Sequence, residues 1–286
     1  MKDLNEFGLF LKKRALWTHR FIERSSVLRL GVMEETITDM HLFSIADKYN
    51  DNVITRKFNR REEGAISGAD YLWIIGEPGN WLPLLIQAKI INPKTQNCQH
   101  FDYKDGVQRK QLLQYARCHS FVPMYCIYSY VPPKIQFPDR FGNSTQDRED
   151  WACSFLSPKA VRQLAAEGKK QQQEILKYSI PWMDPFCFNT SDGVSGASLA
   201  EAIVEIRDSS SALRMKSIPR LEASKNSLQK RISWENLDTL HAIRAEIPPA
   251  ICNWFNNKSS LQFDVPLTGA SIISTIPINQ IDELHR

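Results

Sequence analysis

The chain has 286 residues, of which 42% are hydrophobic and 24% are charged, a composition typical of a globular protein with a sizeable core. Its formal net charge of +4 permits nucleic-acid binding without arguing for it, so such binding would need a local basic patch. The apolar runs are far shorter than the roughly 20 residues of a membrane span, which excludes a membrane protein and predicts no membrane partner.

The cysteines indicate which metal sites are absent and which cellular compartment to expect. None of the six cysteines belongs to a C-x-x-C pair, so neither a zinc ribbon nor an iron–sulfur cluster is indicated. Cys126 lies inside an apolar run and is expected to be a buried thiol. These features predict a reduced, cytoplasmic protein.

The first elements are expected to be helices. Residues 3–25 have an amphipathic pattern, with an inner stripe of Leu4, Phe7, Leu11, Thr18, Phe21 and Ile22. Residues 32–50 predict a second helix, with Met33, Ile37 and Met40 at helical spacing. A strand over residues 52–58 and a polar loop over residues 60–67 follow.

A β-hairpin is expected next. Two apolar runs, 70–75 and 84–90, flank a turn rich in glycine, proline and asparagine. Asp70 opens the first strand, and Gln87 and Lys89 lie near the end of the second. Residues two apart on a strand share a face, and antiparallel strands place the start of one beside the end of the other. Asp70, Gln87 and Lys89 are therefore predicted to converge.

The pattern continues with a polar loop over residues 92–106, a helix over 107–120 and an apolar strand over 122–130. The order helix, three strands, helix, strand predicts an α/β fold with a mixed central sheet flanked by helices.

The remainder is expected to complete the same domain, so that residues 1–286 form one unit with a core over about 27–190. A strand at 152–156 and a helix from the capping residue Ser157 to about Tyr178 are predicted. Residues 189–198 resemble a linker. Helices at 199–207, 233–244 and 248–256 and a strand at 270–278 are expected, either added to the main domain or forming a small appendage.

The predicted convergence has a chemical meaning. A carboxylate and an amide oxygen are ligands for a hard metal ion such as Mg²⁺ or Mn²⁺, and a nearby ammonium can offset charge on a phosphate. Asp70, Gln87 and Lys89 supply these groups. Structural interpretations stay open: Asp70 as a turn cap and Lys89 as a solvent-facing strand end. Gln87 is harder to explain that way, because a buried amide needs partners.

Further site residues are expected on the flanking helices. Glu35 is the preferred second carboxylate, with Glu34 and Asp39 nearby, although an early-turn glutamate also suits the helix dipole. Gln111 and Tyr115 are four residues apart and share a helix face, where they can reach phosphate or position the nucleophile. Tyr115 as a core residue is the alternative.

A basic run follows the first expected strand. Arg56, Lys57, Arg60 and Arg61 are candidates for contacts with nucleic-acid phosphates. The alternative is a solvated strand end, partly neutralised by Glu62 and Glu63.

Together these motifs resemble the PD-(D/E)XK, or restriction-endonuclease-like, nuclease superfamily over roughly residues 30–130. Asp70, then Gln87-x-Lys89, with Glu35 upstream, resembles the variant with glutamine found in Mrr-like restriction enzymes and in nuclease domains of bacterial antiphage effectors. Gln111 and Tyr115 resemble the Q-x-x-x-Y element of RecB-like nucleases. The element order agrees with the αβββαβ core of that superfamily.

The resemblance implies a Mg²⁺- or Mn²⁺-dependent nuclease acting on DNA, most simply double-stranded DNA, with a role in antiphage defence. Asp70, Gln87 and Glu35 would hold the metal, with Lys89, Gln111 and Tyr115 as the other catalytic residues; a homodimer follows by analogy only. Two alternatives stay open: an inactive module that binds nucleic acid or a partner, and an effector activated by a ligand or regulator protein.

Overall fold

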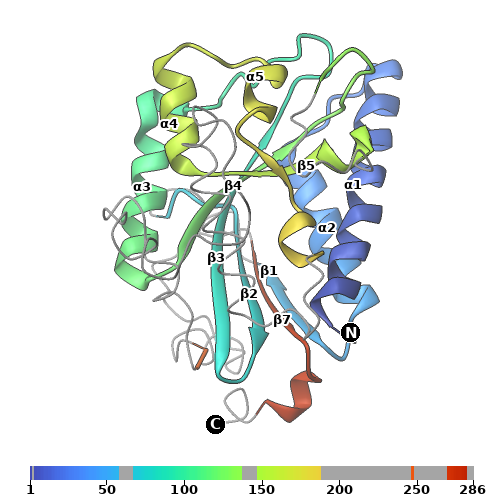
Figure 1. The fold of residues 1–286 in the computed structure, drawn as a ribbon, viewed down its shortest axis with the longest axis vertical. Helices are drawn as coiled ribbons and strands as arrows, with labels where there is room; N and C mark the ends of the chain where they lie inside the picture. The colour runs from blue at the N-terminus through green and yellow to red at the C-terminus, as the bar shows by residue number, and fades with distance from the viewer. Residues whose placement is uncertain (2, 58–66, 137–146, 188–245, 248–268, 282–286) are drawn as a thin grey trace, which may run out of the picture.

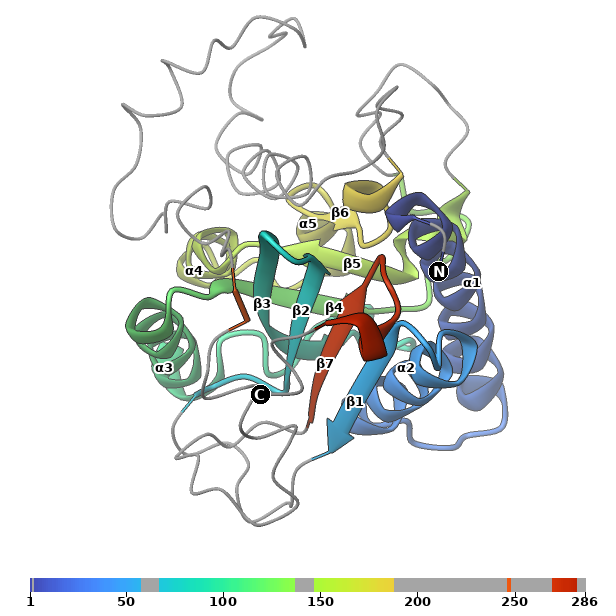
Figure 2. The same cartoon turned by 90° about the horizontal axis from the view of Figure 1, so that it is seen from below.

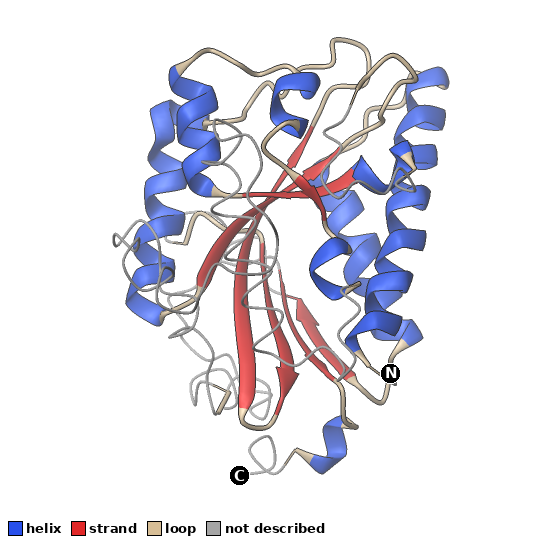
Figure 3. Ribbon diagram, viewed as in Figure 1, coloured by secondary structure: helices blue, strands red, loops and turns tan. Residues whose placement is uncertain are grey.

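A computed structural model describes residues 1, 3–57, 67–136, 147–187, 246–247 and 269–281. Its centre is a seven-stranded mixed sheet with helices on both faces (Figures 1 and 3). Across the sheet the strands are β1 (Val53–Lys57), β7 (Gly269–Ser274), β2 (Tyr71–Glu77), β3 (Asn80–Ile90), β4 (Val122–Tyr128), β5 (Cys153–Leu156) and β6 (Ile180–Pro181). The mixed α/β class that the sequence predicts is therefore confirmed.

Two pairs of neighbouring strands run parallel, β7 with β2 and β3 with β4, and the other neighbours are antiparallel. The predicted hairpin is the β2–β3 pair, in which Tyr71 lies opposite Ile86. Its turn lies at the bottom of Figure 1, so the start of β2 and the end of β3 meet at the other end of the hairpin.

Helices cover the two faces in pairs (Figure 2). On one face lie α1 (Leu4–Val27) and α2 (Glu34–Lys48), and on the other α3 (Tyr103–His119) and α4 (Pro158–Ala166). Short helical segments complete the described part of the chain: η2 (Arg148–Ala152), α5 (Gln172–Leu176), η3 (Asp184–Phe186) and η4 (Ile278–Gln280). Among these helices, none has the length and apolar character that crossing a membrane requires.

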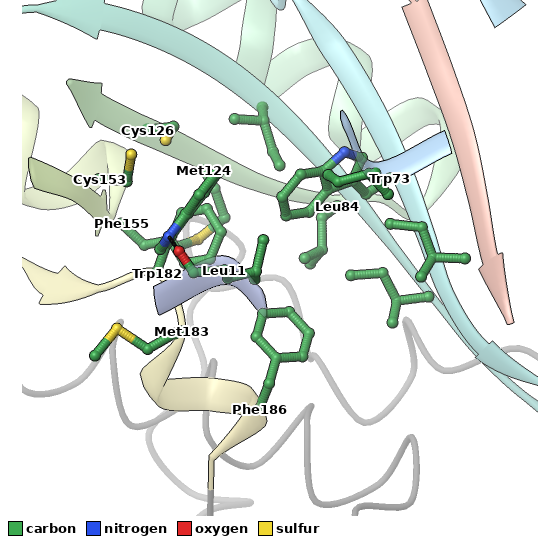
Figure 4. Close-up of a cluster of buried hydrophobic side chains, with 14 of the residues drawn as sticks. Leu11, Trp73, Leu84, Met124, Cys126, Cys153, Phe155, Trp182, Met183 and Phe186 are labelled. Atoms are coloured by element: carbon green, nitrogen blue, oxygen red, sulfur yellow. Dashed lines mark hydrogen bonds between the residues drawn. The ribbon is translucent and has the colours of Figure 1, made fainter. Parts of the chain in front are cut away.

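Each face of the sheet has its own apolar core, because successive strand residues alternate between faces. Figure 4 shows part of the core beneath α1, where Trp73, Phe155 and Trp182 gather. The Trp182 indole N–H donates to the backbone carbonyl of Leu11 at 3.0 Å. Burial of these large rings ties α1 to the sheet.

The first two helices agree with the sequence pattern in extent but not in every contact. In α1 the predicted stripe is buried, except that Phe21 is half-buried. In α2 only Ile37 of the three spaced apolar residues is buried, while Met33 and Met40 are exposed. Thr38, His41, Leu42 and Ile45 make up the rest of its buried face.

The long helix predicted from Ser157 to Tyr178 is wrong. Ser157 does cap α4, since its hydroxyl accepts from the Ala160 N–H at 3.1 Å. The helix ends at Ala166, and Gly168 adopts the left-handed region with φ +67°. A left-handed residue terminates a helix, so Gly168 separates α4 from α5.

The expected C-terminal strand exists as β7, and it lies inside the sheet between β1 and β2. Ile272 pairs with Ile54 of β1 on one side and with Ile74 of β2 on the other. The order of the strands in the sheet therefore differs from their order in the chain. The restriction-endonuclease-like core that the sequence suggests stays a proposal. The helices expected at 199–207, 233–244 and 248–256 lie outside the described residues, and nothing tests the predicted domain limits.

Gly68 fixes the contact between α3 and the segment that leads into β2. Its φ is +65°, and an added Cβ would lie 2.3 Å from the Gln108 carbonyl oxygen. Gly79, in the β2–β3 turn, also has a positive φ, of +92°, but an added Cβ would meet no atom within 4 Å. The two glycines thus share a positive φ, which strains any residue with a Cβ, and they differ in steric contact.

This difference predicts a graded loss of stability. Gly79→Ala is expected to cost about 1–2 kcal/mol of unfolding free energy, from left-handed strain alone. Gly68→Ala is expected to cost roughly 3 kcal/mol or more, because α3 must also move. Urea unfolding of both variants checks this, and equal losses would show that the α3 contact gives way without cost.

Candidate functional site

The predicted convergence at the end of the hairpin is confirmed. The Asp70 N–H donates to the Ile86 carbonyl at 2.9 Å, which continues the antiparallel ladder by one residue. The Asp70 Oδ2 atom accepts from the Gln87 side-chain N–H and from the Ala88 backbone N–H, the latter at 2.6 Å. Asp70 and Gln87 are therefore held together by the register of the hairpin.

Gln87 is fully buried and only partly hydrogen-bonded. Its Nε2 atom donates to Asp70 and also to the Ala88 carbonyl at 3.0 Å, whereas its Oε1 atom has no hydrogen-bond partner. An unpaired buried amide oxygen costs roughly 1–3 kcal/mol. Gln172 also has such an oxygen, so the missing partner alone does not identify a site. Gln87 is a candidate site residue because it also lies beside Asp70.

Lys89 is 4% exposed, and its ammonium lies 3.5 Å from the Glu34 Oε1 atom at the start of α2. The sequence favoured Glu35 as the acidic partner of this site and named Glu34 only as its neighbour. Burial raises the pKa of Glu34, Lys89 opposes that rise, and Glu35 adds to it. Glu34 is thus the residue that sequence reasoning ranked too low.

Glu35 remains close to the cluster. Its charge raises the pKa of both Glu34 and Asp70, and its Oε2 atom is buried with no hydrogen-bond partner. Glu35 therefore offers a second carboxylate oxygen, as the sequence predicted, although its role as a ligand stays a prediction.

The neighbouring charges and burial together set the pKa of Asp70. Burial raises the pKa of Asp70 to about 7; Lys89 lowers it, while Glu34 and Glu35 raise it. The carboxyl groups of Asp70 and Glu34 thus share the Lys89 ammonium, and Glu35 adds a third negative charge nearby. Because folding raises this pKa from 3.8, the protonated carboxyl stabilises the fold below about pH 4, and that contribution is lost as the pH rises to about 7. A cation bound beside Asp70 would favour the ionised carboxylate and so offset the free-energy cost of burying its charge.

The two candidate residues on α3 have different surroundings. The Cβ atom of Gln111 would lie 3.1 Å from a Cβ built at Gly68, so Gln111 borders the segment leading to Asp70. Tyr115 is buried in the apolar core on that face, with its ring centroid 4.3 Å from that of His119. The contacts of Tyr115 fit the core interpretation, and catalytic roles for both residues stay predictions.

The basic run is only partly described. Arg56 and Lys57 end β1, where their backbones pair with Ala270 and Gly269 of β7. Arg60 and Arg61 lie outside the described residues. Contacts of the four residues with nucleic acid stay predictions.

The side chains present near the hairpin determine which ligands a metal ion could have there. In the described part of the chain, no three His, Cys, Asp or Glu side chains gather closely enough to hold a metal ion. A site at the hairpin would therefore have to include the amide oxygen of Gln87. The unpaired Gln87 and Glu35 oxygens and the excess of carboxyl groups fit such an ion.

Comparison with known proteins gives one match. Residues 8–270 match a family described as "Family of unknown function (DUF6615)". No curated protein and no solved structure matches the chain.

Proposed function

The chain belongs to the DUF6615 family, and we propose that it is a metal-dependent nuclease that hydrolyses phosphodiester bonds in DNA. Mg²⁺ or Mn²⁺ would be held by the Asp70 carboxylate, the Gln87 amide oxygen and a carboxylate of α2, with Glu35 as the first choice. The observation that carries the proposal is the unpaired amide oxygen of Gln87 beside an Asp70 carboxyl whose pKa is raised to about 7.

Each residue then has a distinct task. The Gln87 amide keeps its N–H on Asp70 and leaves its oxygen for the ion. Lys89, buried against Glu34, provides a fixed positive charge where a phosphate gains negative charge during hydrolysis. Glu34 holds the Lys89 ammonium in place. When bound, the metal supplies Lewis-acid chemistry that acidifies a water and offsets charge on the phosphate.

Hydrolysis joins a water oxygen to phosphorus and breaks one bond from phosphorus to a sugar oxygen. The departing oxygen takes up a proton and the attacking water loses one, so no oxidant or second substrate is needed. The site residues therefore have to supply only orientation and charge stabilisation.

Two observations favour a second candidate, a binding module without activity. Gln87 is neutral where the superfamily usually has an acid, and a cluster of three metal-ligating acids or histidines is missing from the described residues. A site of this kind that has lost its metal would gain no thermal stability from Mg²⁺ or Mn²⁺, whereas a working site gains stability by mass action.

The first experiment is cleavage of DNA, both a plasmid and a linear single strand, by purified protein with Mg²⁺ or Mn²⁺. Gln87→Leu removes the amide oxygen with little change in side-chain volume and is expected to lower the cleavage rate about 100-fold or more. Gln172→Leu is the matched control, because Gln172 is equally buried and also has an unpaired Oε1 atom. Cleavage that survives in EDTA or in Gln87→Leu would refute the proposal.

A further inference from the structure

A cavity of about 380 Å³ opens beside the candidate site. One side is formed by the end of α1 and the connection to α2, and the other by the chain that follows β3. Glu34 and Lys89, the ion pair of the candidate site, belong to its lining. A molecule in this cavity would therefore lie against the two residues whose ion pair belongs to the candidate site.

The lining of the cavity has two kinds of surface. Leu30, Val32 and Pro93 supply apolar area, whereas Arg29 and Lys94 are exposed cations. With Lys89 the lining carries three basic side chains from arginine and lysine against the single acid Glu34. This combination suits a ligand with an apolar part and a negative charge, and a nucleotide, with its base and phosphate, has both.

The cavity is formed in advance of any ligand. The Asn92 Oδ1 atom accepts from the N–H groups of Lys94 and Thr95 at 2.9 and 3.1 Å. On the other side, the Leu30 N–H donates to the Ser25 carbonyl at 2.9 Å. Between them Arg29 adopts the left-handed region, with φ +59°, which is uncommon for residues other than glycine. Hydrogen bonds within the chain thus set both sides, one through the Asn92 side chain and one through the backbone.

We propose that this cavity receives the nucleoside next to the scissile phosphate, so that the substrate is DNA with an unpaired nucleotide: a single strand or a frayed end. The inference rests on the proposed nuclease function, since it takes Lys89 as the group that contacts the phosphate. A volume of about 380 Å³ is near the lower end for ligand pockets, roughly 300–1,000 Å³. A base inside a duplex is stacked and paired and cannot enter a concave pocket without leaving the helix.

The test is binding without cleavage, measured in EDTA by fluorescence anisotropy. The probes are a labelled 12-nucleotide single strand of mixed sequence and the blunt duplex of the same sequence. We expect the wild type to bind the single strand about tenfold more tightly than the duplex. Arg29→Gly and Lys94→Ala are each expected to remove most of that preference, because each takes away a cavity-lining charge that only an unpaired nucleotide inside the cavity would contact.

The variants separate binding from folding. Arg29→Gly relieves the left-handed backbone while it removes the guanidinium, so the variant is expected to fold. Arg24→Ala is the control, because Arg24 is an exposed arginine in the last turn of α1 that does not line the cavity. Equal affinity for single strand and duplex, or a preference for single strands that survives in both cavity variants, would overturn the inference.

The outcomes also separate this inference from the proposed function. Preferential single-strand binding that needs Arg29 and Lys94, with no metal-dependent cleavage, would support the nucleotide cavity and reject the nuclease. Metal-dependent cleavage with equal binding of both probes would support the nuclease and reject the cavity assignment.

Discussion

Asp70→Asn is expected to stabilise the metal-free protein at pH 8 and to abolish metal-dependent DNA cleavage. At that pH the wild-type carboxyl is ionised although burial raises its pKa to about 7. An asparagine oxygen can still accept from the Gln87 and Ala88 N–H groups without carrying a charge. A rise of about 3 pKa units corresponds to at most ~4 kcal/mol. Partial exposure of Asp70 reduces the expected gain to about 1–2 kcal/mol.

Thermal unfolding at pH 5 and pH 8, each with EDTA or Mn²⁺, checks this prediction. At pH 5 wild-type Asp70 is mostly protonated, so the stability difference between wild type and variant should shrink. Mn²⁺ should raise the melting temperature of the wild type at pH 8 and leave Asp70→Asn unchanged. Asp150→Asn is the control, since Asp150 is also buried with a raised pKa but lies beside Lys12, 3.2 Å away.

Two results would contradict the prediction. A wild type that millimolar Mn²⁺ does not stabilise at pH 8 would remove the case for a metal at Asp70. A variant less stable than the wild type at pH 8 would show that the ionised carboxylate, rather than the protonated one, favours the fold.

The meeting of Asp70 with Gln87 was predictable because it depends on local rules alone. A short turn fixes the hairpin register, and the period of two places alternate residues on one face. The acidic partner from α2 was harder to identify. Which residues at the start of α2 face the site depends on how the whole helix packs. Met33 and Met40 are exposed, so a prediction that takes them as the buried face of the helix is wrong.

No local sequence pattern indicates the position of β7 within the sheet. Its residues are apolar enough to predict a strand, but its neighbours, β1 and β2, lie about 200 residues earlier in the chain. Strand order is decided by long-range pairing, which single-sequence patterns do not record. The break of the predicted helix at Gly168 did have a signal, because a glycine just after the apolar positions of a helix is typical of a helix end.

Lys89→Met is expected to lower both cleavage and stability, and a second substitution separates the two effects. The change removes the ammonium that faces Glu34 at 3.5 Å and leaves the carboxylate of Glu34 without its partner. Breaking a buried ion pair costs up to roughly 3–5 kcal/mol, and about 1–3 kcal/mol is expected here because Glu34 is half-buried. The cleavage rate should fall about 100- to 1,000-fold through loss of charge stabilisation.

Adding Glu34→Gln to Lys89→Met removes the uncompensated carboxylate. The double variant is therefore expected to regain most of the lost unfolding free energy while remaining inactive. Urea unfolding at pH 8 measures the first quantity, and cleavage of plasmid and single-stranded DNA measures the second. Recovery of cleavage along with stability would mean that Lys89 acts only by neutralising Glu34. Recovery of stability alone, with Glu34→Gln by itself still active, would assign Lys89 to the chemistry, because the loss of the Glu34 carboxylate would then not explain the inactivity.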